Sequence, residues 1–440
     1  MAPRAFWLLI ILLAAAAVAS PQTQATQPAA QPALSVDFTT ALQQARQYAG
    51  QIQTATIAAQ LAREDRIQAK AALLPAVNEF DQFIYTEPNG TGSGVFIAND
   101  GPHVYNLWAN VHEDFSLTKR SDYRRALAAE ALAKAKTDIA TRGLVTTVVQ
   151  NYYGMVIAQR RLVNAQLSLQ EAQRFLDITQ KQEQGGEAAH ADVIKAQLQV
   201  QQREREVQDA QLAIDKARLA LAVLIFPDFN QNFTIVDDLK AVNPLPAFSE
   251  VEAQATSTSP DVQAARASLR QESAGLSSAR LAYYPTFAFD YWYGIDANQV
   301  AIYNPNHQRL LGSAAQGSLT IPIWSWGAIQ SKVRQAELHL KQAQLELSLA
   351  QRQLLANINS FYLEARVAST QIDSLSRAVD LSAESLRLTL LRYQAGEATA
   401  LEVVDAQTTL VQARNAYDDG LSRYRIALAN VQTLTGNLQP

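Results

Sequence analysis

The chain has 440 residues, no cysteine, and a formal net charge of −4 from 37 basic and 41 acidic side chains. The lack of cysteine excludes disulfides, thiolate metal sites, thiol nucleophiles and lipid attachment to an N-terminal cysteine. Because charges of both signs are interspersed, the sequence gives no case for a nucleic-acid partner.

The chain begins with an export signal. Arg4 precedes an apolar run at 6–18 that ends in the small residues around Ala19, which is the pattern of a secretory signal peptide. We assign residues 1–19 to this peptide and the polar residues 20–36 to a flexible N-terminal segment. The run is too short to span a membrane, and no later segment has about twenty continuous apolar residues. The mature protein is therefore expected to be soluble outside the cytoplasm or to form an outer-membrane β-barrel.

The mature chain repeats itself. Residues 186–197 match residues 396–407 at an offset of 210, and Pro75 and Pro285 are also 210 apart. Tyr152-Tyr153 and Phe361-Tyr362 match at an offset of 209. Such self-similarity indicates a tandem duplication. It divides the chain into a first repeat at 37–240, a link at 241–246 and a second repeat at 247–436.

Each repeat contains a long span without proline, at 103–226 and 323–439. Sequence of this kind favours long helices. Gly185-Gly186 and Gly396 fall between two periodic segments, so we expect a descending helix, a tight turn and a returning helix in each span. A single helix over 121–184 would be about 96 Å long at ~1.5 Å per residue, which predicts a helical tube or bundle.

The returning helices carry apolar residues at intervals of seven. Sustained heptads of this kind predict coiled-coil packing. The second returning helix has Val403, Leu410, Tyr417, Tyr424 and Val431, and the first has Val193, Val200, Val207, Ile214 and Leu221.

Between the helical parts the apolar period changes to two, which is typical of strands. We expect strands near 77–86, 104–117, 286–294 and 313–324. Apolar side chains occupy one face and polar ones such as Asp290 the other, so we expect lipid on the first face and an aqueous lumen on the second. The expected lipid-facing residues are Phe287, Phe289, Tyr291, Tyr105 and Leu107.

The tryptophans of the mature chain support this interpretation. Trp108, Trp292, Trp324 and Trp326 lie in or at the ends of these segments, as in the aromatic belts of outer-membrane barrels. An ordinary β-hairpin packed on the helices is the alternative. Four strands cannot close a barrel, and no open edge survives in lipid. The chain is therefore expected to oligomerise; three copies would give twelve strands, and the strand count alone also permits other numbers.

Two segments resemble the TolC-like outer-membrane factor (outer membrane efflux protein) family. Residues 317–327 read Gly-Ser-Leu-Thr-Ile-Pro-Ile-Trp-Ser-Trp-Gly, and Arg392-Tyr393-Gln394-Ala395-Gly396 leads into Val403-Val404-Asp405-Ala406-Gln407. With the duplication, the resemblance covers essentially the whole mature chain. It implies a mixed α and β membrane protein, a homotrimer in which a long α-helical coiled-coil barrel continues a twelve-stranded outer-membrane β-barrel.

The same resemblance implies a function and partners. The protein would be the outer-membrane channel subunit of a tripartite efflux or type I secretion system in a Gram-negative bacterium, a passive duct from periplasm to exterior. A periplasmic adaptor (membrane fusion) protein and an inner-membrane transporter would be its partners. The first repeat departs from the family pattern, because Tyr48-Ala49-Gly50 replaces the usual Asn-Pro that Ser259-Pro260 resembles in the second.

The resemblance also directs attention to the two helix turns. We expect Gly185, Gly186, Glu187, Gly396 and Glu397 to form the periplasmic tip that docks the adaptor; simple helix capping is the alternative.

Some family members carry inward aspartates near this closed end, and Arg387 and Leu390 occupy the corresponding places here. Arg387 is therefore the gate candidate.

No constellation for chemistry is present in the sequence. The five histidines are scattered without metal-ligand spacing, and phosphate-loop, dinucleotide and serine-nucleophile fingerprints are absent. We therefore expect no catalytic, cofactor or metal site, and no enzyme. The rival hypothesis is a soluble periplasmic coiled-coil adaptor or scaffold, which would not explain the tryptophan-bearing strands. The sequence does not indicate the exported substrate.

Overall fold

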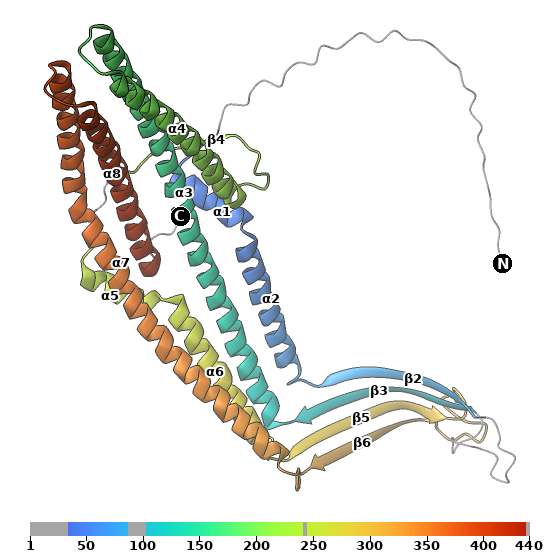
Figure 1. The fold of residues 1–440 in the computed structure, drawn as a ribbon. Coiled ribbons are helices and arrows are strands. Elements are labelled where there is room, and N and C mark those ends of the chain that lie inside the picture. Colours follow the sequence, from blue (N-terminus) through green and yellow to red (C-terminus); the bar gives the residue numbers. More distant parts are fainter. Residues whose placement is uncertain (1–33, 87–102, 241–243, 437–440) are drawn as a thin grey trace, which may run out of the picture.

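The computed structural model describes residues 34–86, 103–240 and 244–436 (Figure 1). The expected signal peptide 1–19 lies outside these residues, as does 20–33 of the segment that follows it. The two halves share the order helix, helix, strand, strand, helix, helix, and within the described residues the first half adds a short strand at each end. The first half comprises β1 (Leu34–Val36), α1 (Phe38–Tyr48), α2 (Gly50–Ala71), β2 (Ala76–Tyr85), β3 (His103–Phe115), α3 (Leu117–Gln184), α4 (His190–Ile225) and β4 (Phe233–Ile235). The second comprises α5 (Phe248–Thr258), α6 (Pro260–Leu281), β5 (Thr286–Ala297), β6 (Leu311–Thr320), α7 (Ala328–Gln394) and α8 (Ala400–Thr435).

The molecule is an elongated helical body with a sheet at one end (Figure 1). The helices α3 and α7 contain 68 and 67 residues, or about 100 Å each at ~1.5 Å per residue. The shorter α2 and α6 run beside their halves near the sheet, and α4 and α8 run beside their far halves. We call the level where α1, α5, β1 and β4 pack on the long helices the waist. Among the described residues, no helix is both long and apolar enough to cross a membrane.

The helices of the two halves correspond at the main offset of the sequence repeat. The bounds of α5, α6 and α8 follow those of α1, α2 and α4 at that one offset. Phe38 contacts the ring edge of Tyr152 at 5.6 Å between centroids, and Phe248 contacts Tyr362 in the same way at 5.1 Å. Tyr362 is therefore the counterpart of Tyr152. The expected match of Phe361 with Tyr152 at an offset of 209 is wrong by one residue.

Both halves break a helix at the same place, just before α2 and α6. In the second half Pro260 is the first residue of α6, and the Ser259 hydroxyl accepts the amide of Val262 at 3.4 Å. In the first half Ala49 is extended and Gly50 stands where the second half has proline. The departure from the family pattern therefore leaves the break in place.

A second, two-stranded sheet lies at the waist. In it β1 pairs in parallel with β4. Val36 is fully buried in a core that includes Leu42 and Tyr152, and the Tyr152 hydroxyl donates to the carbonyl of Val236 at 2.7 Å. The expectation that 20–36 is a flexible segment is therefore wrong at its end, where burial of Val36 holds the chain in place.

The four-stranded sheet has the order β2-β3-β5-β6, and all its neighbours are antiparallel. Val77 pairs with Val111, and Phe287, the counterpart of Val77 in the second repeat, pairs with Leu319. The strand expected at 313–324 ends at Thr320, because β5 begins at its partner Thr286. The strand expected at 104–117 ends at Phe115, because Ser116 caps α3. Within the part of the chain that the structure describes, both β2 and β6 are open edges.

The turns that reverse the long helices are alike. Gly186 and Gly396 have φ angles of +79° and +75°. After each glycine, the amide of a glutamate donates back to the last helical turn at 2.8 Å, which is the hydrogen bond of a glycine C-cap. Gly185 has φ −76°, similar to −84° at its counterpart Ala395. Of the adjacent glycines, only Gly186 has a backbone conformation that favours glycine.

Replacing Gly186 tests this distinction. We expect Gly186→Ala to destabilise the turn by about 1–2 kcal/mol, because a side chain is strained in the left-handed region. Gly185→Ala is the matched control; no atom lies closer than 3.5 Å to its added methyl group, so it should leave the turn intact. Hydrogen exchange of the amides between α3 and α4 measures the difference. Equal protection in the two variants would contradict the assignment.

Candidate functional site

One face of the four-stranded sheet is largely aromatic. Val111 of β3 stands opposite Tyr291 of β5, and cross-strand partners point to the same side of a sheet. The same register puts all five expected lipid-facing residues on one face, which we call the aromatic face. Their side chains are exposed or half-buried in the single chain. They are Phe287, Phe289, Tyr291, Tyr105 and Leu107.

The opposite face carries hydrogen-bonded polar side chains, and we call it the polar face. The Asp290 carboxylate lies 2.7 Å from Nδ1 of His112 and accepts a hydrogen bond from the Asn110 amide at 3.4 Å. Asn106 donates to Gln82 at 3.0 Å. These hydrogen bonds involve three of the four strands. Trp108 and Trp292 are also on this face, so the sheet is not strictly aromatic on one side and polar on the other.

The edge strand β2 departs from the pattern. Glu79 and Asp81 pair with Ala109 and Leu107, so both carboxylates are on the aromatic face. Alternation within β2 was too weak to assign its faces from the sequence, and only the register with β3 does so.

The connection from β6 to α7 exposes apolar residues. The side chains of Ile323, Trp324 and Trp326 are 90%, 75% and 89% exposed. The two tryptophan rings contact each other edge-on at 5.7 Å. Trp326 and Gly327 both have positive φ angles, 51° and 80°, which turns the chain from the sheet into the helix. These residues lie at the junction of the sheet and the helical body.

The two helix turns lie next to each other at the far end of the body (Figure 1). A buried apolar group joins the hairpins there, and we call it the tip cluster. In it the rings of Phe175 and Tyr393 meet edge-on at 5.2 Å, and Gln182 donates to the carbonyl of Tyr393 at 3.3 Å. The cluster consists of Phe175, Ala196, Leu386, Tyr393, Ala400, Val403 and Leu410.

The outer residues of the turns face solvent. Gly185, Gly186, Glu187, Gly396 and Glu397 are all exposed. Arg392 holds the second turn by donating to the carbonyl of Glu397 at 3.1 Å. The structure therefore brings the five expected tip residues to one end of the molecule.

The gate candidate and its neighbour differ in environment. Arg387 is exposed and its guanidinium pairs with Glu384 at 2.7 Å. Leu390 packs against the tip cluster. In the single chain Arg387 is exposed and Leu390 is half-buried.

Ion pairs between the waist and the tip were not predicted from the sequence. The Arg160 guanidinium donates to Asp237 at 2.6 and 2.9 Å and to Asp418 at 2.7 Å. Asn164 donates to Asp418 at 3.0 Å and to Asn415 at 3.1 Å. Burial opposes the charge of Arg160, but the hydrogen bonds to both aspartates outweigh burial and raise its pKa. Arg160 and Asp418 are 258 residues apart, and no local motif indicates such a pair.

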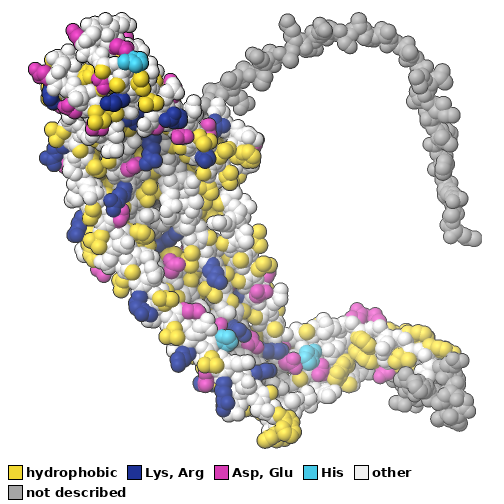
Figure 2. Space-filling model, viewed as in Figure 1, with side chains coloured by type: hydrophobic (Ala, Val, Ile, Leu, Met, Phe, Trp, Pro, Cys, Tyr) yellow, Lys and Arg dark blue, Asp and Glu magenta, His cyan; other side chains and the backbone are white. Residues whose placement is uncertain are grey.

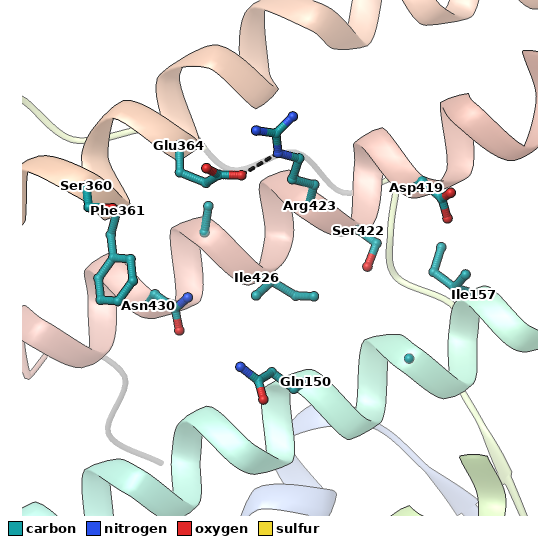
Figure 3. A pocket seen from close by; sticks show the side chains of 12 residues that line it. Gln150, Ile157, Ser360, Phe361, Glu364, Asp419, Ser422, Arg423, Ile426 and Asn430 are labelled. Carbon is teal, nitrogen blue, oxygen red and sulfur yellow. Dashed lines mark hydrogen bonds and ion pairs between the residues drawn. The ribbon is translucent and has the colours of Figure 1, made fainter. Parts of the chain in front are cut away.

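A cavity of about 530 Å³ lies between α3, α7 and α8 (Figure 3). Gln150 lines it on one side, and the ion pair of Glu364 with Arg423 lines it on the other. The part of the chain that the structure describes contains no group of three or more histidine, aspartate or glutamate side chains that could hold a metal ion. On the face drawn in Figure 2, positive and negative side chains are interspersed along the helical body.

Comparison with known proteins identifies the family. The model of the outer membrane efflux protein family matches residues 41–225 and 252–437. The chain is 28% identical over 329 residues to the cobalt-zinc-cadmium resistance protein CzcC of Cupriavidus metallidurans, covering 71% of each chain. It is 24% identical over 390 residues to the pyoverdine export outer membrane protein OpmQ of Pseudomonas aeruginosa, covering 85% of this chain and 78% of the relative.

The fold has a counterpart among solved structures. The CmeC outer membrane channel of Campylobacter jejuni superposes with a TM-score of 0.79 at 17% identity, over 91% of this chain and 85% of CmeC. Together with the family match, these findings confirm the resemblance seen in the sequence and exclude the soluble adaptor or scaffold. The chain belongs to the outer membrane efflux protein family, and it is a channel subunit in the outer membrane of a Gram-negative bacterium that extends into the periplasm.

Proposed function

We propose that three copies form a twelve-stranded barrel continued by a helical tube, and that this assembly is a passive duct from periplasm to exterior. The observation that carries the proposal is a two-faced sheet with two open edges, β2 and β6, at the end of helices about 100 Å long. Unpaired backbone groups are costly in lipid, so the edges must be covered. Pairing β6 of one copy with β2 of the next covers both. Four strands from each of three copies give twelve.

Apolar residues on the helices support the same assembly. The helix α7 carries a stripe of apolar side chains that are exposed among the described residues of the single chain, and we call it the α7 stripe. A second set on α2 and α4 is the α2–α4 stripe. Burying both stripes between copies would remove a large apolar area from water, which drives association. The α7 stripe is Leu338, Leu345, Leu355, Leu363 and Val367, and the α2–α4 stripe is Ile57, Leu61, Ile67, Leu212, Leu219 and Val223.

The cargo of the duct is set elsewhere. The relatives named above are called a cobalt-zinc-cadmium resistance protein and a pyoverdine export protein, and these cargoes differ chemically. A passive channel serves both if an inner-membrane transporter selects the cargo. A periplasmic adaptor would then connect that transporter to the exposed turns at the tip. Arg387 would act at the gate, on the side of the turns that is nearer the waist.

The assembly is tested by the mass of the protein in detergent. We expect a complex of three mature chains that is recovered with the outer membrane and resists extraction by high salt. Multi-angle light scattering of the purified protein measures the mass. A stable monomer, or release by salt alone, would overturn the proposal.

The two sheet faces make opposite predictions. Phe289→Arg should destabilise the assembled barrel by about 2–4 kcal/mol if the residue lies near the bilayer midplane, as measured by unfolding in lipid vesicles. Asp290→Asn on the polar face should change single-channel conductance while trimers still form. If the arginine has no effect and the asparagine prevents assembly, the faces are reversed.

The tip is tested by export and crosslinking. Gly396→Val should impair export, because strain at φ +75° distorts the turn, while trimers still form through distant contacts. Cysteines at Glu187 and Glu397 should crosslink to the adaptor. The control is a cysteine at Asp228, near the waist. Efficient crosslinking there and none at the tip would place the adaptor at the waist instead.

A further inference from the structure

The internal contact between the two halves of one chain predicts the contact between neighbouring copies. In the single chain, α3 packs against α6 and α8 of the second half. The counterpart of α3 is α7, and the counterparts of α6 and α8 are α2 and α4. In a ring of identical copies, α7 would therefore pack against α2 and α4 of the next copy. We call the first contact the internal seam and the second the copy seam.

Burial supports this correspondence residue by residue. Leu338 and Leu345 of the α7 stripe are 67% and 63% exposed, and their counterparts on α3, Ala128 and Ala135, are 7% and 5% exposed. The same holds for Leu355, Leu363 and Val367, whose counterparts Val145, Tyr153 and Ile157 are buried.

The α2–α4 stripe shows the same difference in burial. Ile57, Leu212 and Leu219 are exposed. Their counterparts in the second repeat, Ala267, Ser422 and Ala429, are buried in the internal seam. The α7 stripe, and Ile57, Leu212 and Leu219 of the α2–α4 stripe, therefore occupy positions whose counterparts are buried in the single chain.

An arginine fixes the register of the seam. In the internal seam Arg142 donates to the carbonyls of Thr258 and Leu434 at 2.9 and 3.0 Å. These carbonyls belong to the last turns of α5 and α8, where backbone acceptors lack intrahelical partners. The counterpart of Arg142 is also an arginine, Arg352, which is exposed in the single chain and donates within its own helix to the carbonyl of Ser348.

We propose that Arg352 donates to the carbonyls of Tyr48 and Leu224 of the next copy. We also propose that, between this contact and the tip, the copy seam and not the internal seam separates when the tip opens. Tyr48 and Leu224 are the counterparts of Thr258 and Leu434 and lie in the last turns of α1 and α4. The proposal rests on the proposed ring of copies and adds its register and its weaker seam.

The sheet follows the same rule. Val111 pairs with Tyr291 across the internal seam. The counterpart of Val111 on β6 is Leu319, because Val77 pairs with Val111 and its counterpart Phe287 pairs with Leu319. The counterpart of Tyr291 on β2 is Asp81. Leu319 would therefore stand opposite Asp81 of the next copy. Both are on the aromatic face, so each face of the sheet continues across the copy seam without a change of side.

Between the waist and the tip, the two seams differ in their charged side chains. The internal seam has Arg160 on Asp418 and Arg161 on Asp419. The corresponding pairs at the copy seam are Thr370 with Gln208 and Gln371 with Asp209. Neither pair joins opposite charges.

The neighbouring pairs also differ between the two seams. Asn164 donates to Asn415 and Asp418 in the internal seam, and Arg414 pairs with Glu171 at 3.2 Å. At the copy seam Ser374 stands opposite Arg205, and Leu381 opposite Glu204. The hairpins of one chain are therefore linked by ion pairs, whereas the corresponding positions of the copy seam do not pair opposite charges.

Mutation of Arg352 tests the register. Arg352→Gln should lower the temperature at which detergent-purified trimers dissociate into single chains. Arg377→Gln is the matched control, because Arg377 also donates to the carbonyl four residues earlier. Its counterpart Leu167 is exposed in the single chain, so Arg377 is not expected to lie in the copy seam. Equal dissociation temperatures for the two variants would refute the contact.

Disulfides test which seam parts. The chain has no native cysteine. The pair Ser374→Cys and Arg205→Cys should give linked dimers and trimers on oxidation, block export, and recover on reduction. The pair Asn164→Cys and Asn415→Cys should close within one chain and leave export intact. Export blocked by the second pair and not by the first would reverse the assignment.

A shifted pair checks the geometry. Ser374→Cys with Leu212→Cys is displaced by about 10 Å along the helix, too far for a disulfide, so it should not crosslink. Crosslinking of this pair in place of Ser374 with Arg205 would refute the register, whereas the channel proposal would stand as long as trimers and export persist. A chain that forms no trimers would instead refute the channel proposal.

A transplanted ion pair gives an independent measurement. Thr370→Arg together with Gln208→Asp recreates at the copy seam the contact of Arg160 with Asp418. The double variant should export several-fold less than either single variant at low salt, and high salt should reduce the difference. Equal export by all three variants would show that the copy seam does not part.

Discussion

An open strand edge cannot remain in lipid, and this constraint organises the protein. The sheet exposes the backbone groups of β2 on one side and of β6 on the other, and each unpaired group costs several kcal/mol in a hydrocarbon environment. The proposed closure between copies would remove this cost. Because the strands are connected in sequence to α2, α3, α6 and α7, closing the barrel would also bring the helices of neighbouring copies together.

The duplication simplifies that assembly. One chain already contains one complete contact between its two halves, from the pairing of β3 with β5 to the packing of α3 against α8. A ring built from such chains alternates internal and copy seams with the same backbone geometry. Side chains then differentiate the seams. Each seam has an arginine at the equivalent position, Arg142 in the internal seam and Arg352 in the copy seam, whereas the ion pair of Arg160 with Asp418 belongs to the internal seam alone. A channel that must hold together at the membrane and open at its far end needs this combination of shared and unshared contacts.

Much of the fold could be predicted from the sequence because its signals are periodic. The heptad residues Val403, Leu410, Tyr424 and Val431 are at most 2% exposed, and alternation on β3 and β5 placed Tyr105 and Phe289 on one face. Gly186 and Gly396 marked the turns because only glycine takes their conformation readily.

The rest depends on contacts between distant residues. The strands β1 and β4 contain three residues each, too few for a period to be read, and they are held by burial of Val36 and Phe233 in the same core. Nothing near Arg160 indicates Asp418, because their meeting depends on how the two halves pack. The strand β6 ends earlier than expected because its pairing with β5 defines where it stops. The tip residues could be located from glycine signals, but their exposure and the buried contact of Tyr393 beneath them required the structure.

Electron cryo-microscopy of the mature protein in lipid nanodiscs tests the central claim, a ring of three chains in which six equivalent units alternate between two kinds of seam. The account predicts a closed twelve-stranded barrel with β6 of each chain paired to β2 of the next, Leu319 opposite Asp81, and α7 seated between α2 and α4 of the neighbouring chain. A different number of chains, or a ring in which the α7 stripe faces solvent, would contradict it.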